Sequence, residues 1–393
     1  MVIVSHRFRG FLGPLFNVRL QCFAWLTCVF ATLGQAAEHL TLNRDGTELH
    51  VSGKVVVEAD NGGLLLCAPD GNLWLVQPDE IVGRRKDDQP FKGLTHDQFA
   101  EQLLAELPAN FHVHKTAHYL ICYNTSKPYA EWCGALFERL FRGFNTYWSY
   151  LGIKPSDPPF PLVAIVFDSK ESYARYARAN NGIESAFGYY NPVSNHMIMY
   201  DLTGVEGFAK RGARLGSTAL INRVLSQPGA EHMVATIVHE ATHQLAYNSG
   251  LQARLAANPF WVSEGLAIFF EAPDLKSSKG WRGIGNVNQS RLFRFRAYLK
   301  ERPRESIVTL LANDTRFRAP TGRLNTYAEA WALTYYLIRT RKKDYVKYLK
   351  MLGQKAPIVE DDAETRIAEF KAFFGSDLAK LDAAFVRYMS KLR

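Results

Sequence analysis

Apolar and polar residues alternate along the first part of the chain, between His39 and Val82. The runs include L-H-V-S-G-K-V-V-V-E and L-W-L-V, and turn-favouring residues separate them: Asp45-Gly46, Asn61-Gly-Gly63 and Asp70-Gly71. A period of two is typical of strands with one buried face, and these pairs favour tight hairpins. We therefore predict a small all-β module over residues 38–83. Residues 84–109 are expected to hold a polar linker, centred on 83–90, and a short helix at 95–107.

From about Asn110 the pattern changes to alternating strands and helices. Strands are predicted at 118–123 and 162–167, with a helix at 129–151 between them, and 187–190 and 196–200 read as a hairpin. From Glu231 onward nearly every segment has helical periodicity. Strands followed by helices indicate an α+β fold, here one domain over 110–393 with a mixed sheet and a mostly helical C-terminal half.

The beginning of the chain has the pattern of an export signal. Residues 1–21 carry arginines and no acid, residues 22–33 are apolar, and small residues follow at 34–37. The apolar run is about a dozen residues long, short of the roughly 20 that a spanning helix needs. We therefore expect a signal peptide over 1–37, a secreted or periplasmic protein, and no permanent membrane span.

Removal of that signal would leave three cysteines, Cys67, Cys122 and Cys133. An odd number allows at most one intramolecular pair. Cys122 and Cys133 are close enough in sequence to form a disulfide in an oxidising compartment. Three buried thiols are the alternative, and the sequence leaves both open.

Composition and charge change this picture little. The apolar share of 47% and the charged share of 22% are those of an ordinary globular protein. The formal net charge is +9, but three of the arginines fall in the signal. The most basic run, residues 339–343, lacks interleaved aromatic residues and is interpreted as a solvated helix end, so no nucleic-acid partner is expected.

The stretch H-E-A-T-H, from His239 to His243, carries the clearest chemistry. Residues four apart share one face of a helix, so the two imidazoles can reach one metal ion while Glu240 lies beside them as a base. At about 100° per residue, both histidines lie nearly opposite the apolar stripe. That stripe is Val234, Ile237, Val238, Ala241 and Leu245. This register argues against two ordinary core histidines.

A catalytic zinc needs a third protein ligand. Glu264 is the candidate, 21 positions after His243, in F-W-V-S-E-G-L-A. Asn258-Pro259 supplies a break, and Ser263 is expected to cap a second helix whose first turn carries Glu264. The two helices could then pack side by side and bring the three ligands together.

At these residues the chain resembles the gluzincin metallopeptidases, and more narrowly a group of secreted bacterial peptidase-like proteins. The resemblance rests on H-E-A-T-H and on W-V-S-E-G-L-A, which is similar to the W-x-x-E-G-x-A element of zinc aminopeptidases; a weaker similarity continues into Y-A-E-A-W at 327–331. It covers roughly residue 110 to the C-terminus. It implies that His239, His243 and Glu264 bind Zn²⁺, that Glu240 is the catalytic base, and that the Tyr327 hydroxyl stabilises the transition state.

The chain departs from that family at two places. Thermolysin-like enzymes place an acidic residue four positions after the ligand glutamate to orient a histidine, but Ile268 stands there. Glu271 is two turns from Glu264, about 10 Å by helical rise, too far to bind the same ion. It could orient a ligand, contact substrate, or lie solvated at the helix end. The G-x-M-E-N element of the aminopeptidases is absent, so exopeptidase activity does not carry over.

Several assignments remain open in the sequence. Tyr327 begins a run whose aromatic residues suit packing, and Tyr247 is a rival for its role. His112, His114 and His118 alternate but have no acidic or cysteine companions, and His196 and His232 have no visible partners. The 188–200 hairpin could pair with an extended peptide or could be a covered edge.

The function predicted from these patterns is a secreted zinc-dependent peptidase that acts on a peptide or protein substrate. Two alternatives remain, a non-catalytic binding or structural protein on a peptidase-like fold, and a zinc hydrolase of non-peptide amides. Cleavage specificity, the role of the β module and the oligomeric state cannot be predicted from the sequence.

Overall fold

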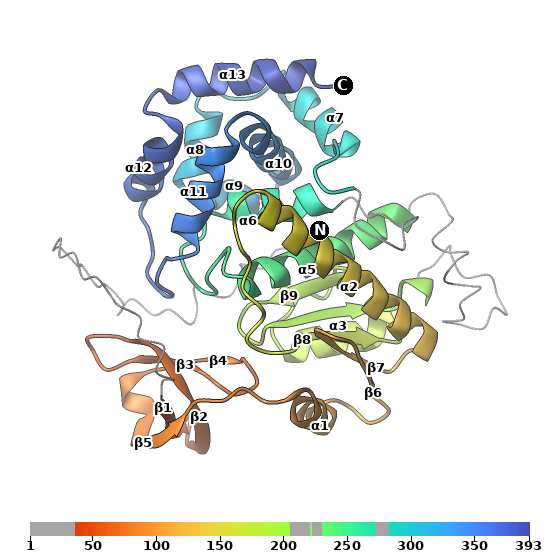
Figure 1. The fold of residues 1–393 in the computed structure, drawn as a ribbon, viewed down its shortest axis with the longest axis vertical. Coiled ribbons are helices and arrows are strands. Elements are labelled where there is room, and N and C mark those ends of the chain that lie inside the picture. Colours follow the sequence, from red (N-terminus) through yellow and green to blue (C-terminus); the bar gives the residue numbers. More distant parts are fainter. Residues whose placement is uncertain (1–35, 205–220, 222–229, 272–282) are drawn as a thin grey trace. The chain divides into compact units, whose positions relative to one another are not determined.

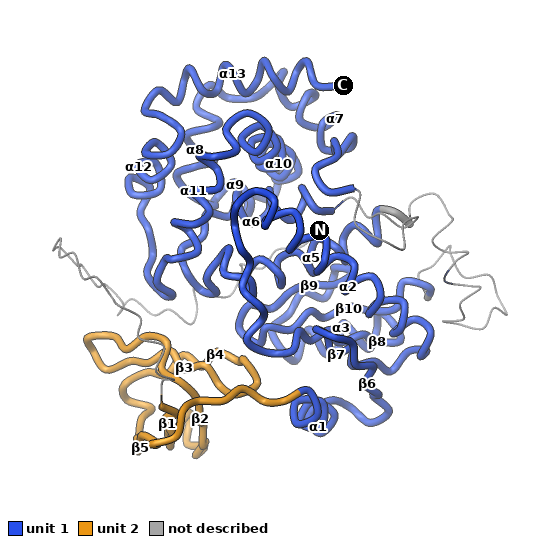
Figure 2. Tube along the Cα trace, viewed as in Figure 1, with its two compact units in different colours: residues 1–2, 96–393 blue, residues 3–95 orange. Residues whose placement is uncertain are grey.

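The computed structural model describes residues 36–204, 221, 230–271 and 283–393 (Figure 1). Almost all of the expected signal peptide therefore lies outside the described residues. The chain divides between Thr95 and His96 into two compact units (Figure 2). An all-β unit comes first, and a mixed sheet with a mostly helical C-terminal half follows, which confirms the predicted α+β class.

The N-terminal unit is an antiparallel sheet with strand order β4-β3-β2-β1-β5. Its strands are β1 (Ala36–Arg44), β2 (Thr47–Glu58), β3 (Leu64–Cys67), β4 (Leu73–Val76) and β5 (Ile81–Pro90). One short 3₁₀ helix, Pro78–Glu80, precedes β5. A small core of apolar side chains from β1 to β4 holds the sheet together: Leu40, Leu42, Val51, Leu64, Leu66 and Val76.

The prediction of a linker at 83–90 is wrong, because these residues form most of strand β5. Thr41 of β1 lies opposite Gly83 in an antiparallel ladder. The run is polar because its side chains form cross-strand ion pairs. The Arg84 guanidinium lies 2.6 Å from a Glu38 oxygen and 2.7 Å from a Glu58 oxygen. An edge strand stabilised in this way lacks the apolar alternation by which strands are usually recognised.

The second unit contains a five-stranded mixed sheet in the order β6-β7-β8-β10-β9. Its strands are β6 (His112–Lys115), β7 (Tyr119–Tyr123), β8 (Leu162–Phe167), β9 (Gly188–Asn191) and β10 (His196–Tyr200). β7, β8 and β10 are parallel, and the two outer strands are antiparallel to their neighbours. The predicted strands and hairpin are therefore present, and β9 is an edge strand.

Helices surround this sheet and form the rest of the unit (Figure 1). Those that precede the candidate site are α1 (His96–Glu106), α2 (Lys127–Tyr150) and α3 (Lys170–Ala179). Those that carry and surround it are α5 (Ala230–Asn248), α6 (Phe260–Phe270), α7 (Gln289–Tyr298), α8 (Ser306–Ala312), α9 (Thr315–Arg318), α10 (Arg323–Thr340), α11 (Lys342–Leu352), α12 (Ala363–Phe374) and α13 (Leu378–Lys391). One continuous apolar core runs from the sheet through α2, α5, α6 and α10.

The cysteines in the described residues are buried and form no disulfide. Alternation along β7 explains why Cys122 and Cys133 do not pair. Ile121 faces the core that contains Cys133 of α2, so Cys122 faces the opposite side of the sheet. Burial raises the pKa of the Cys122 thiol to about 12.

Candidate metal centre

Helix α5 carries the H-E-A-T-H stretch, and its register is the predicted one. All five residues of the apolar stripe are buried in the core. Two polar side chains fix the helix against the sheet: Gln244 Nε2 donates to the carbonyls of Val163 (3.0 Å) and Asn195 (2.8 Å), and Asn248 bonds the Asn195 side chain. The face with His239 and His243 is also buried, because α6 packs over it.

Helix α6 begins four residues earlier than the sequence predicts. It starts at Phe260 after Pro259, so Ser263 is not its cap and Glu264 lies in the second turn. The Phe260 N–H donates to the carboxylate of Asp314 (3.1 Å), which is distant in the sequence. This bond satisfies a backbone donor of the first turn, as a local capping side chain would. Ser263 instead accepts a hydrogen bond from Gln252 (2.7 Å). A cap 54 residues away in the sequence cannot be read from a local pattern.

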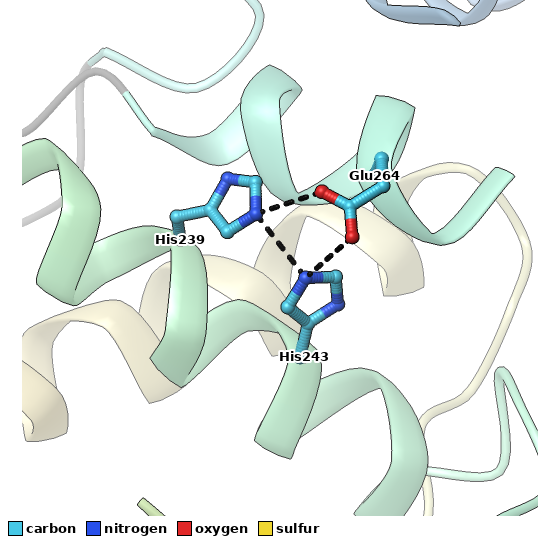
Figure 3. Close-up of side chains that lie close together, drawn as sticks. All are labelled: His239, His243 and Glu264. Atoms are coloured by element: carbon cyan, nitrogen blue, oxygen red, sulfur yellow. Dashed lines mark hydrogen bonds and ion pairs between the residues drawn. The ribbon is translucent and has the colours of Figure 1, made fainter. Parts of the chain in front are cut away.

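The three predicted ligands converge, as Figure 3 shows. The Nε2 atoms of His239 and His243 are 3.2 Å apart, and Glu264 oxygens lie 3.0 Å from the first and 3.6 Å from the second. Ligand atoms about 2.0–2.1 Å from a tetrahedral zinc are separated by roughly 3.3 Å. The observed spacings therefore match those of a metal-binding group.

Charge at this group is carried unequally by the two histidines. Burial lowers the pKa of both, but hydrogen bonds with the carboxylates of Glu264 and Glu271 raise the pKa of His239 to about 10. For His243 the effect of burial prevails over the opposing charge of Glu264 and lowers the pKa to about 4. A positive charge is therefore favourable beside these carboxylates, and either a proton on His239 or a cation at the Nε2 atoms can provide it.

Glu240 is almost fully buried beside the ligand group, with 2% of its surface exposed. Its Oε2 accepts the backbone N–H of Tyr190, 3.0 Å away on edge strand β9. Burial raises the pKa of Glu240 to about 7; the charge of His239 opposes the rise and that of Glu264 adds to it. A carboxylate with this pKa can both accept and return a proton near neutral pH.

Glu271 is not a solvated residue at a helix end. It is buried at the C-cap of α6, its Oε2 lies 3.4 Å from His239 Nδ1, and Arg291 of α7 is 3.5 Å away. Of the three alternatives left open by the sequence, contact with a candidate ligand is the one found. Arg291 was not among the predicted residues, and nothing in the local sequence points to it.

Tyr327 lies in the second turn of α10 and is buried, with its ring edge-on to Phe317. Burial raises its pKa, and the nearby charges of Glu264 and Glu240 raise it further, so the hydroxyl is a neutral donor. The rival Tyr247 stacks on Tyr190 with ring centres 5.7 Å apart. Burial raises the pKa of Tyr247 to about 12, and Ser263 is its hydrogen-bond partner.

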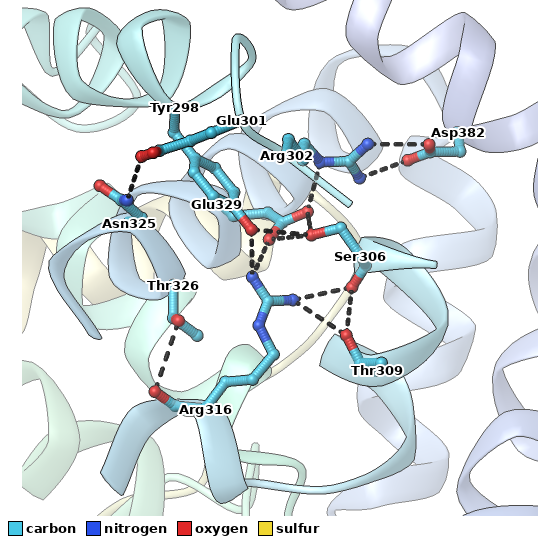
Figure 4. A network of polar contacts seen from close by, with 10 residues as sticks. All are labelled: Tyr298, Glu301, Arg302, Ser306, Thr309, Arg316, Asn325, Thr326, Glu329 and Asp382. Atoms are coloured by element: carbon cyan, nitrogen blue, oxygen red, sulfur yellow. Dashed lines mark hydrogen bonds and ion pairs between the residues drawn. The ribbon is translucent and has the colours of Figure 1, made fainter. Parts of the chain in front are cut away.

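A buried polar network fixes the α10 turn that follows Tyr327 (Figure 4). Glu329, with none of its surface exposed, accepts hydrogen bonds from Arg302 (2.7 Å) and Ser306 (2.8 Å) and is also paired with Arg316. Arg302 continues to Asp382 of α13 through two hydrogen bonds. The network joins α10 to α8 and α13 and so holds Tyr327 in register.

Among the described residues, the remaining histidines do not gather into a second site. His112 and His114 lie on β6, while His118 bonds Glu138 (2.9 Å) and stacks on Phe141. Within the described ranges, His239, His243 and Glu264 are the one group of His, Cys, Asp or Glu side chains that could hold a metal ion.

The fold and the site define an α+β protein with a buried His-His-Glu group that can bind a metal ion. Residues 233–359, from α5 to α11, match the model of a family described as "Protein of unknown function (DUF1570)". The matched segment contains the three candidate ligands, Glu240 and Tyr327. A comparison with curated proteins gave no match.

In the part of the chain that the structure describes, no helix is both long enough and apolar enough to cross a membrane.

Proposed function

We propose that this chain is an exported zinc-dependent peptidase of the gluzincin type. The observation that carries the proposal is the convergence of His239, His243 and Glu264 with Glu240 next to them. Two imidazoles and one carboxylate within 3.6 Å of one another are a donor set suited to zinc. A non-ligand glutamate directly beside that set is what metal-assisted hydrolysis needs as a base.

Zinc is favoured over harder cations by the chemistry of the donors. Mg²⁺ and Ca²⁺ prefer sites built from oxygen atoms, whereas imidazole suits zinc and other transition metals. Three protein ligands leave one position for water or substrate, as in catalytic zinc sites, while structural zinc sites are closed by a fourth protein ligand.

Each residue has a defined task in the proposed reaction. When bound, zinc would polarise a water molecule and the substrate carbonyl. Glu240 would accept the proton from that water and deliver it to the leaving amine, and the Tyr190 N–H holds its carboxylate in place. The neutral Tyr327 hydroxyl would donate a hydrogen bond to the oxyanion that forms as the carbonyl is attacked.

A peptide is the favoured substrate because of the sheet edge beside Glu240. β9 is the outermost strand of its sheet, and its Tyr190 is joined directly to the catalytic base. An extended peptide that pairs with this edge would pass beside the base, and it would use backbone groups other than the Tyr190 N–H, which Glu240 already accepts.

The test compares wild type with Glu240→Gln and Glu264→Ala on a mixed peptide library, with zinc content measured in parallel. We expect about one zinc per wild-type chain, which Glu240→Gln retains and Glu264→Ala loses. Cleavage should fall about 10²–10⁴-fold in Glu240→Gln, because the base is lost and the metal is not.

Each other outcome has a distinct meaning. Zinc binding without cleavage of any peptide would favour a binding protein on this fold. Hydrolysis of simple amides alone would indicate a non-peptide substrate. Unchanged cleavage by Glu240→Gln would contradict the proposal.

A further inference from the structure

His239 lies between two carboxylates that approach opposite nitrogens of its ring. Its Nε2 is 3.0 Å from Glu264 and faces His243, while its Nδ1 is 3.4 Å from Glu271. Figure 3 shows the second ring nitrogen pointing away from the other two ligands. A neutral imidazole has one N–H and one lone pair, so a carboxylate at Nδ1 leaves the lone pair on Nε2.

Glu271 can reach His239 Nδ1 because of its place on α6. It follows Glu264 by seven residues, which returns it to the same helical face about two turns further along. Ile268, one turn after Glu264, is 1% exposed in the apolar core. An acid at that position would be a buried charge in apolar surroundings, and the carboxylate that contacts His239 Nδ1 comes instead from the next turn.

Arg291 holds the Glu271 carboxylate from a separate helix. Its guanidinium lies 3.5 Å from Glu271 Oε2, and the exposed His232 on α5 adds a weaker electrostatic contribution. Burial alone would raise the pKa of Glu271, but His239 and Arg291 hold it below its ordinary value.

The segment that precedes α7 is hydrogen-bonded to α6, and this contact fixes the position of Arg291. The Gly285 N–H donates to the Phe269 carbonyl (3.4 Å), and Asn288 caps the first turn of α7. A side chain at Gly285 would meet the Phe269 ring at 2.7 Å, and its φ of +72° also favours glycine. Only glycine allows this close approach.

We propose that Glu271 is the positioning residue of the metal site: it accepts the Nδ1–H of His239, directs Nε2 toward the ion, and is itself held by Arg291. The inference rests on the proposed metal site but not on peptide hydrolysis. It assigns to a carboxylate at the end of α6 the orienting task that thermolysin-like enzymes give to a residue one turn after the ligand glutamate.

The experiment measures the zinc affinity of the full chain by competition with a chromogenic chelator. The variants are Glu271→Ala, Glu271→Gln, Arg291→Gln and the double variant Glu271→Ala/Arg291→Gln. Loss of an outer-shell partner typically weakens metal binding 10–100-fold. We expect that loss in Glu271→Ala and a smaller one in Glu271→Gln, whose amide oxygen can still accept the Nδ1–H.

Arg291 should matter only through Glu271. Arg291→Gln alone should weaken zinc binding, while the double variant should bind zinc as Glu271→Ala does. Asp382→Asn is the matched control, because it also breaks a carboxylate–arginine pair but lies on α13. It should lower thermal stability and leave the zinc affinity unchanged.

Zinc binding by the wild type separates a failure of the proposed metal site from a failure of the positioning role of Glu271. A wild-type chain that binds no zinc would overturn the proposed function. The positioning role alone would be overturned if the wild type binds zinc tightly and the zinc affinities of Glu271→Ala and Glu271→Gln equal that of the wild type or of the Asp382→Asn control. A double variant that binds zinc more weakly than Glu271→Ala would assign Arg291 a role of its own and contradict its action through Glu271.

Discussion

Glu240 is a carboxylate that the fold has removed from water, and this burial should be measurable without substrate. Its folded-state pKa of about 7 lies above the ordinary value of 4.5. Between these values the folded chain keeps a proton that the unfolded chain releases, so stability falls as pH rises. The contribution of Glu240 is complete below pH 4.5 and is lost as pH passes through 7.

In the metal-free chain we therefore expect Glu240→Gln to gain stability over wild type as pH increases. The difference should grow by about 2–3 kcal/mol between pH 5 and pH 8, because the uncharged amide escapes the cost of burying an anion. Urea unfolding at both pH values in the presence of a chelator measures it. A difference that does not change with pH would show that Glu240 ionises as freely as an exposed glutamate.

Tyr327 and Tyr247 can be separated by removing one hydroxyl at a time. If Tyr327 donates to the oxyanion, Tyr327→Phe should reduce kcat about 10²–10³-fold with little change in KM. Tyr247→Phe is the matched control, and we expect it to retain kcat within a few-fold because its hydroxyl is bonded to Ser263. The reverse order of effects would transfer the role to Tyr247.

At the scale of elements, α6 and α10 meet so closely that only glycine fits at the contact. A Cβ on Gly265 would lie 2.1 Å from the Thr334 hydroxyl and 2.8 Å from the Ala330 carbonyl. The glycine of the E-G pair thus allows the helix that carries Glu264 to lie against the helix that carries Tyr327.

Gly265→Ala should consequently force the two helices apart. We expect a loss of about 1–3 kcal/mol in unfolding free energy, the usual cost of overpacking, and weaker zinc binding as Glu264 moves. Gly83→Ala is the control, since an added Cβ there meets nothing closer than 3.6 Å. An alanine variant as stable as wild type would show that α6 and α10 can separate at no cost.

The network around Glu329 leads to a second prediction about α10. Glu329→Gln leaves Arg302 and Arg316 without their shared anion, and breaking a buried ion pair typically costs about 3–5 kcal/mol. The exposed Glu301 lies at the margin of the same network, where its carboxylate accepts from Asn325 (Figure 4). Glu301→Gln should change stability by less than about 0.5 kcal/mol. Chemical denaturation of both variants tests this difference.

At the scale of the whole molecule, the two units have separate cores, so a metal should stabilise only one of them. All three candidate ligands belong to the unit that contains residues 96–393. Zinc at about 100 times its Kd should stabilise that unit by about 2.7 kcal/mol. Hydrogen exchange should show greater protection in peptides from 96–393 on adding zinc and no change in 36–95. Equal protection in both would mean that the units unfold together.

What the sequence determined by itself is what short-range geometry can encode. Positions four apart on one helix bring His239 and His243 together whatever surrounds them, and the apolar stripe fixes which way they face. The order of strands and helices also follows from local periodicity, so the α+β class was predictable. Glu264 was predicted from its place at the start of the next helical segment, and its motif also resembles that of a known family.

The tertiary structure decided everything that depends on a distant partner. The Asp314 carboxylate starts α6 at Phe260. Ion pairs of Arg84 with Glu38 and Glu58 help to form a strand from the polar run around Arg84. The contact of Glu271 with His239 and Arg291 belongs to the same class. Partners 20 or more residues away meet only when the core has formed, and no local pattern records which of them will meet.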